Sequence, residues 1–240
     1  MSADTLSPKL STGMGSAPLL SPDASRGAEA ALRRLAAVAV LAVLLGLVVQ
    51  GLVLAALLMA GSDLPAPAAV AVEFARGVTW SLLVCSGVGV ATLLIKVQPI
   101  VSGLIALCLA PLAVAGAKAA QTVVAGWLAA VDEPALLPLG TVSVLRALEY
   151  GLLAWLLGRL VLRDALRPWP FLGVGAAVAL LFGGGIAGLT FYAAQSAGAP
   201  LPLPKLAATA VNEIASPVGC ALVIYWGRLA ARHLGAIGAA

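Results

Sequence analysis

Six apolar segments, each long enough to cross a lipid bilayer, follow one another with short connections between them. About 20 apolar residues suffice to cross a hydrocarbon core roughly 30 Å thick. The segments cover residues 33–60, 70–95, 99–129, 143–163, 170–194 and 204–227. Only 10% of the residues are charged, whereas a soluble domain carries roughly 25%. The sequence therefore predicts an all-α polytopic membrane protein, a bundle of about six transmembrane helices with the lipid bilayer as its partner.

The sequence on either side of these segments has the composition of tails. Residues 1–28 mix Ser, Pro, Gly and Ala without apolar periodicity, which predicts a disordered cytoplasmic tail. Residues 29–232 are then the six-helix transmembrane domain, and residues 233–240 are a short cytoplasmic C-terminus. The first apolar run exceeds the apolar region of a signal peptide, so we expect it to be retained as a membrane helix.

The distribution of Lys and Arg predicts the orientation in the membrane. The connections 61–69, 131–142 and 195–204 contain neither residue, whereas the alternate connections and both terminal regions contain several. Because basic residues gather on the cytoplasmic side, both termini are expected to be cytoplasmic. Abundant Ala, Leu, Gly and Val are typical of a GC-rich genome and favour a bacterial inner membrane. Trp127, Tyr150 and Tyr192 are expected to lie in the outer interfacial belt.

Several functional classes lack the residues they require. His233 is the only histidine, which removes bis-histidine haem ligation, His-rich metal sites and Ser-His-Asp catalysis. Cys85, Cys108 and Cys220 lie singly in apolar runs and are predicted to be packing residues. No glycine-rich phosphate loop is present, and the arginines are dispersed rather than gathered into a nucleic-acid patch. We therefore expect no enzymatic activity, no cofactor, no metal and no nucleic-acid partner.

Polar residues within the spans are the candidates for function. They lie in the outer half of four spans and form neighbouring pairs: Glu73 with Arg76, Lys118 with Gln121, Arg146 with Glu149, and Asn212 with Glu213. Charged groups in a membrane usually face the bundle interior and pair with one another. One paired cluster is thus predicted, with Glu149 in salt-bridge reach of Arg76 or Lys118. The alternative is that the basic residues snorkel to the outer headgroups and that Glu73 complements a helix dipole.

Glu213 is the residue that we expect to be functional. It lies roughly 13 Å along the sixth span from Pro204, too far for a short carboxylate to reach the headgroups. Pro111 and Pro217 are expected to break the third and sixth spans, and the second break would expose a carbonyl near Glu213. Two halves of three spans, each ending in a broken helix, predict a possible 3+3 inverted repeat around a transport site. Gly184 and Gly188 have the spacing of a close helix-packing face.

Two function classes fit these features. The first is a small transporter or channel, with Glu213 and Glu149 as ion or proton sites and Arg76, Lys118 and Arg146 as contacts for anions. The second is a non-catalytic subunit or assembly factor of a larger membrane complex, associating as a homo-oligomer or with other membrane subunits. A water-filled pocket at Glu213 would favour the first class. A dry, fully paired cluster with a flat face of small residues would favour the second.

Overall fold

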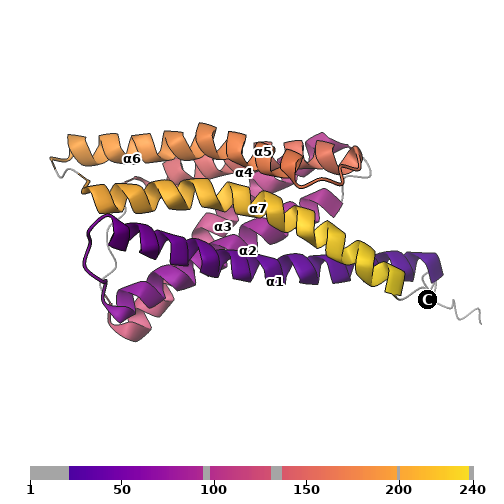
Figure 1. Cartoon of the computed structure of the whole chain (residues 1–240), viewed down its shortest axis with the longest axis horizontal. Coiled ribbons are helices and arrows are strands. Elements are labelled where there is room, and N and C mark those ends of the chain that lie inside the picture. Colours follow the sequence, from indigo (N-terminus) through magenta and orange to yellow (C-terminus); the bar gives the residue numbers. More distant parts are fainter. Residues whose placement is uncertain (1–21, 94–97, 131–136, 199–200, 238–240) are drawn as a thin grey trace, which may run out of the picture.

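The computed structural model shows a bundle of long helices (Figure 1). It describes residues 22–93, 98–130, 137–198 and 201–237, and within these ranges the side chains of residues 27–230. The regular elements of this part of the chain are α1 (Pro22–Met59), α2 (Pro67–Leu93), α3 (Pro99–Leu128), α4 (Leu139–Leu162), α5 (Trp169–Val178), the π-helix η2 (Ala179–Gly183), α6 (Gly184–Ser196) and α7 (Leu203–Ile237).

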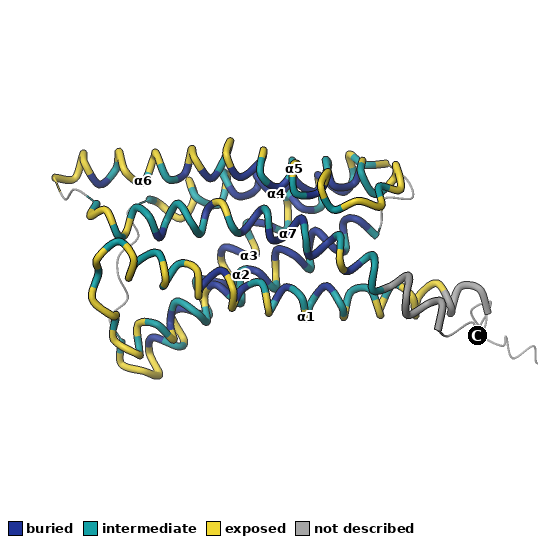
Figure 2. Tube along the Cα trace, in the orientation of Figure 1, coloured by how far each residue is buried: buried dark blue, intermediate teal, exposed yellow. Residues whose placement is uncertain are grey.

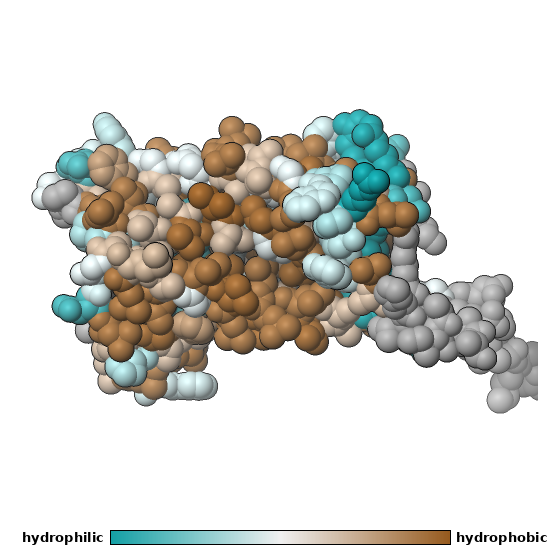
Figure 3. Space-filling view, viewed as in Figure 1, coloured by the Kyte–Doolittle hydropathy of each residue, from teal (hydrophilic) through white to brown (hydrophobic). Residues whose placement is uncertain are grey.

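The lengths and hydropathy of these helices confirm the all-α membrane bundle. Five of the described helical segments are long and apolar enough to cross a membrane: α1, α2, α3, the run from α5 through α6, and α7. Helix α4 has 24 residues, which span roughly 36 Å at 1.5 Å per residue and also exceed the hydrocarbon core. Apolar residues cover the middle of the face shown in Figure 3, and hydrophilic residues on this face gather mainly at one end.

The first and last helices extend beyond the predicted spans. Helix α1 begins at Pro22, so the last part of the predicted tail is helical, while residues 1–21 lie outside the described residues. Helix α7 continues to Ile237 and takes in most of the predicted C-terminal segment, of which residues 238–240 lie outside the described part.

Consecutive spans run in opposite directions along the bundle. Helix α1 packs along both α2 and α7, α3 packs along α2 and α4, and the run from α5 to α6 packs on α7 and α4. The start of α1 and the end of α7 lie at the same end of the bundle, which we call the terminal end (Figure 1). The opposite end, where α1 connects to α2, α3 to α4 and α6 to α7, is called the far end. In the predicted orientation the far end is the outer one.

Small residues at the helix contacts let the helices pack closely around the core. Figure 2 shows buried residues along the inner faces of the central helices, whereas much of α6 is exposed. A Cβ atom at Gly46 of α1 would lie 2.7 Å from the Cα of Val78 in α2, and one at Gly175 of α5 would lie 2.8 Å from the Cα of Val218 in α7. Contacts this close need glycine, because any side chain would push the two backbones apart.

The two prolines do not break their helices, contrary to the prediction. Pro111 lies inside the continuous helix α3, and Pro217 lies inside the continuous helix α7. Each proline removes one backbone hydrogen bond. Unwinding the helix would leave several more backbone groups unsatisfied in a medium without water, so the helix continues. The inverted repeat stays a prediction, and the halves differ in detail because α2 is continuous whereas its counterpart is divided by η2.

The glycine-rich part of the fifth span also differs from the prediction. A Cβ atom at Gly184 or Gly188 would meet no atom within 4 Å, and both residues are exposed on the outside of the bundle. Gly183, at the end of η2, is buried and makes the close contact instead. The π-helix rotates the following turn, so the packing face does not follow the regular spacing on which the prediction rested.

Candidate functional site

Arg146, Glu149 and Glu213 form a buried ionic group between α4 and α7, which we call the carboxylate–arginine triad. The Arg146 guanidinium donates from Nη1 to Glu149 Oε2 and from Nη2 to Glu213 Oε1, each at 2.6 Å. Relative exposures are 7% for Arg146, 0% for Glu149 and 5% for Glu213. The pairing of Glu149 with Arg146 uses the three-residue spacing on one helix face. The prediction that these polar residues face the bundle interior and pair is confirmed for the triad.

The triad lies deep in the predicted membrane. Glu149 is roughly 15 Å along α4 from Leu139, and Glu213 is roughly 15 Å along α7 from Leu203, at 1.5 Å per residue. Both distances approach half of a hydrocarbon core about 30 Å thick. The Arg146 side chain reaches Glu149, which lies one turn further from the far end of α4. The snorkelling alternative is thus wrong for Arg146.

Aromatic side chains surround the guanidinium. Its carbon Cζ lies 5.3 Å from the ring centroid of Trp80 in α2, a cation–π distance. The Trp80 ring meets the Tyr150 ring edge to face, with centroids 5.5 Å apart. Tyr150 is 1% exposed, so its predicted place in the interfacial belt is wrong: it follows Glu149 on the inward face of α4. The exposed Trp127 and Tyr192 remain compatible with that belt.

The triad contains two carboxyl groups and one guanidinium, and its hydrogen bonding is incomplete. Glu149 Oε1 and Glu213 Oε2 are buried without a hydrogen-bond partner. Glu213 Oε1 also lies 3.4 Å from the Asn212 amide nitrogen, which donates to it, whereas Glu149 holds one contact with Arg146. If both carboxyls were ionised, the triad would carry a net charge of −1 in the apolar interior. An uncompensated buried charge is costly, so the site calls for one further positive charge.

The backbone of α7 is also unusual at Glu213. Pro217 has no N–H group, so it cannot donate the helical hydrogen bond that the Glu213 carbonyl would otherwise accept. The residue facing this carbonyl is Gly183, where a Cβ atom would lie 2.8 Å from the Glu213 carbonyl oxygen. Only glycine permits that approach. The π-helix of the fifth span therefore meets α7 at the carbonyl that the proline leaves without its helical donor.

The remaining predicted polar residues form a second group rather than part of the triad. Arg76 Nη2 donates to Glu73 Oε2 at 2.5 Å, and both side chains are 45% exposed. Gln121 in α3 lies 3.5 Å from Glu73 Oε1, and Lys118 Nζ lies 3.5 Å from Gln121 Oε1. The prediction that Glu149 pairs with Arg76 or Lys118 is wrong, because Arg146 on its own helix is nearer to it. The sequence predicted one polar cluster across four spans, whereas the structure has two separate groups.

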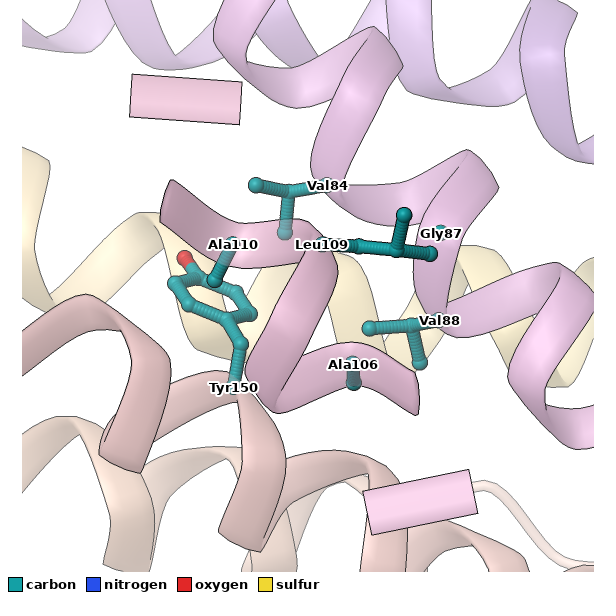
Figure 4. A pocket seen from close by; sticks show the side chains of 7 residues that line it. All are labelled: Val84, Gly87, Val88, Ala106, Leu109, Ala110 and Tyr150. Atoms are coloured by element: carbon teal, nitrogen blue, oxygen red, sulfur yellow. The ribbon is translucent and has the colours of Figure 1, made fainter. Parts of the chain in front are cut away.

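A small cavity lies between α2, α3 and α4, and it does not reach the triad. Its volume is about 10 Å³, about the minimum that holds one water molecule. The lining in Figure 4 is apolar apart from the Tyr150 hydroxyl, and consists of Val84, Gly87, Val88, Ala106, Leu109, Ala110 and Tyr150. This cavity is therefore not the pocket at Glu213 that would favour a transporter. The triad is not the fully paired cluster that would favour a complex subunit, because two of its carboxylate oxygens have no hydrogen-bond partner.

Further polar contacts lie near the terminal end. Arg34 Nη2 donates to Thr92 Oγ1 at 3.2 Å, which joins α1 to α2. Arg228 of α7 forms a salt bridge of 3.2 Å with Asp164, which follows α4. These contacts tie the helix ends together where Figure 3 shows the more hydrophilic surface. They involve residues close to the predicted cytoplasmic face, where long cationic side chains can reach water.

The sequence did not reveal Trp80, Tyr150 or Gly183 as parts of the site. Trp80 lies one helical turn after Arg76, and Tyr150 directly follows Glu149, so their proximity to charged residues was visible in the sequence. The choice of partner depends on how α2, α4 and α7 pack, which local spacing does not determine. Comparison with protein families, curated proteins and solved structures found no match to this chain.

Proposed function

We propose that this chain is a membrane transport protein that moves a proton or a monovalent cation through the carboxylate–arginine triad. The observation that carries the proposal is the pair of buried, unpartnered oxygens, Glu149 Oε1 and Glu213 Oε2, beside a single guanidinium. One glutamate would suffice to neutralise Arg146. A second glutamate at this depth adds a negative charge that no second cation contacts among the described residues, and in this proposal a mobile positive species balances it.

The cost of this arrangement supports a functional role. Placing one charged side chain at the centre of a bilayer costs about 2.5 kcal/mol or more, and such groups commonly mark ion and proton pathways. Transport sites of small helical membrane proteins also lie near the bilayer midplane. The triad has that depth and draws on two helices, α4 and α7, both from the second half of the chain.

The structure has the features of an occluded conformation in this proposal. The triad is buried, and the nearby cavity is small and apolar. Opening requires a helix to move, and two places with irregular helical hydrogen bonding, η2 and Pro217, adjoin Glu213. Irregular turns of this kind are frequent sites of bending. A shift of the fifth span against α7 would therefore change the surroundings of Glu213 directly.

The same proposal places the protein in a bacterial inner membrane with both termini in the cytoplasm. Support comes from the connections at the far end, which lack Lys and Arg in the sequence, and from the basic residues Arg163, Arg167 and Arg228 at the terminal end. We propose that the chain has no enzymatic activity and needs no cofactor, and that it functions as a homo-oligomer or beside other membrane subunits.

The test uses the purified full chain reconstituted into liposomes that contain a dye sensitive to H⁺, Na⁺ or K⁺. Each ion gradient is imposed separately, with the membrane potential clamped. Wild type should carry one of these ions faster than protein-free liposomes, and Glu149→Gln should abolish that flux. Glu29→Gln is the matched control, because Glu29 forms an exposed pair with Arg33 far from the triad. Absence of flux under every gradient would overturn the proposal.

A second candidate function is that of a subunit of a larger membrane complex. The observation in its favour is the exposed surface of Gly184, Gly185 and Gly188, where a Cβ atom at each position would meet no atom of this chain within 4 Å. Small residues on a lipid-facing helix allow another helix to approach closely. Native electrophoresis of the solubilised chain tests this surface, because Gly188→Leu should dissociate a complex that uses it. The liposome assay separates the two functions, because a subunit without transport activity carries no ion flux.

A further inference from the structure

We infer that the triad holds a single proton, and that this proton is carried by Glu149 rather than by Glu213. The inference deepens the proposed function, on which its role in transport rests, by naming the ion and the residue that binds it. It starts from the charge count, since two carboxyls face one guanidinium and each retains a buried oxygen without a partner.

Among the residues whose side chains the structure describes, Arg146 is the one cation that acts on Glu149, so none is left to balance the second carboxylate. The titratable groups that face it from the packed elements are Arg146 and Tyr150 of α4, Glu213 and Cys220 of α7, and, beside Tyr150, Cys85 of α2. Of these only Arg146 is cationic, and its guanidinium already contacts both carboxyl groups. Tyrosine and cysteine side chains are neutral or negative, so they cannot supply the missing charge.

The donor set does not suit a metal cation. Hard cations take about six oxygen ligands or more, whereas the triad offers two unpartnered carboxylate oxygens. No group of three metal-binding side chains occurs among the residues that the structure describes. The Arg146 guanidinium also lies between the two carboxyls, where it would repel a second cation. A proton needs only one oxygen and no coordination shell.

The hydrogen bonds distinguish the two carboxyl groups. Glu213 Oε1 accepts from Arg146 Nη2 and from Asn212 Nδ2, so two donors stabilise its ionised form. Among the described residues Glu149 accepts from Arg146 alone, and it is 0% exposed. Deeper burial with fewer donors favours the neutral form of Glu149 over that of Glu213. The geometry therefore assigns the proton to Glu149 and the negative charge to Glu213.

This assignment reverses the roles expected from the sequence, in which Glu213 was the foremost candidate. In the assigned state Arg146 and Glu213 neutralise each other, and protonated Glu149 completes a triad without net charge. Release of the proton leaves a net charge of −1, which drives the group to take up another proton or to open toward water.

The test is infrared spectroscopy of the full chain in lipid bilayers at neutral pH. The C=O stretch of a protonated carboxyl group lies apart from the amide bands and shifts in D₂O. Wild type and Glu29→Gln should show this band, and Glu149→Gln should lack it. Glu149→Asp should displace it, whereas Glu213→Asp should leave it in place. Replacing K⁺ by Na⁺ in the buffer should not change it.

Three results would overturn the inference: no protonated carboxyl band in wild type, a band that follows the Glu213 variants, or a band removed by Na⁺. The wild-type spectrum alone shows whether a protonated carboxyl band is present, so the test does not depend on every variant folding. Circular dichroism of each variant confirms its helix content before comparison. A band that follows Glu149 in a chain without ion flux would support the proton site and reject the transport function.

Discussion

Removing both carboxylates of the triad should destabilise the bundle much more than removing either one. Glu149→Gln leaves Glu213 as the counter-charge of Arg146, and Glu213→Gln leaves Glu149 in that role, each 2.6 Å from the guanidinium in the parent structure. Glutamine keeps nearly the same volume and an oxygen that accepts a hydrogen bond. The double variant leaves the Arg146 guanidinium, 7% exposed, without any anionic partner.

The magnitudes follow from this count. A hydrogen bond to a charged partner contributes about 1 kcal/mol more than one between neutral groups, so each single variant should lower the free energy of unfolding by about 1 kcal/mol or less. A buried charge left without its counter-charge costs about 3–5 kcal/mol. The destabilisation of the double variant should thus exceed the sum of the single variants by about 1–3 kcal/mol, or roughly five- to 150-fold in the unfolding equilibrium constant.

The assay is reversible unfolding in mixed micelles of a mild and a denaturing detergent, followed by circular dichroism. The four proteins form a double-mutant cycle, with Glu29→Gln as the exposed control. Strict additivity within about 0.5 kcal/mol would show that the two carboxylates do not share Arg146 as a common partner. A single variant as unstable as the double would show that the glutamate left in that variant cannot serve as the counter-charge of Arg146. Either result would refute the reasoning from charge balance.

Three further predictions concern the surroundings of the triad and the orientation. Gly183→Ala should lower the free energy of unfolding by about 1–3 kcal/mol, because the added Cβ would lie 2.8 Å from the Glu213 carbonyl oxygen. The control Gly184→Ala should be neutral or slightly stabilising, and equal effects of the two variants would contradict the contact. Trp80→Leu should cost about 1–2 kcal/mol in the same assay through the lost cation–π contact and ring packing, and an unchanged stability would remove Trp80 from the site. With the native cysteines replaced, Asp63→Cys should react with an impermeant thiol reagent on intact cells and Leu166→Cys only after permeabilisation; the opposite pattern would invert the orientation.

The spans could be predicted from the sequence because they depend on local quantities. Apolar length identifies a membrane helix, and the ends of α2 and α3 lie within a few residues of the predicted bounds. The burial of Arg146, Glu149 and Glu213 was also accessible, since charges at that depth must face protein rather than lipid. The free energy of membrane insertion depends on each segment separately, so the positions of the spans can be read from a single sequence.

The partner of each charge could not be predicted, because it depends on the rotation and separation of packed helices. Two equally spaced pairs, Glu73 with Arg76 and Arg146 with Glu149, look alike in the sequence. One is half exposed, whereas the other is buried against α7. The π-helix could not be predicted from the sequence either. Three consecutive glycines permit several backbone geometries, and the packing against α7 selects the one that is observed.

The chain position of the triad has a consequence for biogenesis. Arg146 and Glu149 lie one turn apart on α4, so this segment can leave the translocon as a locally neutralised pair before the last span has been synthesised. Glu213 arrives only with α7, which also packs along α1 and completes the bundle. Glu213, the second glutamate of the triad, therefore enters the bilayer last, opposite an Arg146 guanidinium that is already in place. Truncation before residue 203 should yield an inserted intermediate with five spans that retains a balanced charge in α4 and the contact of α1 with α2, but lacks the contact of α1 with α7.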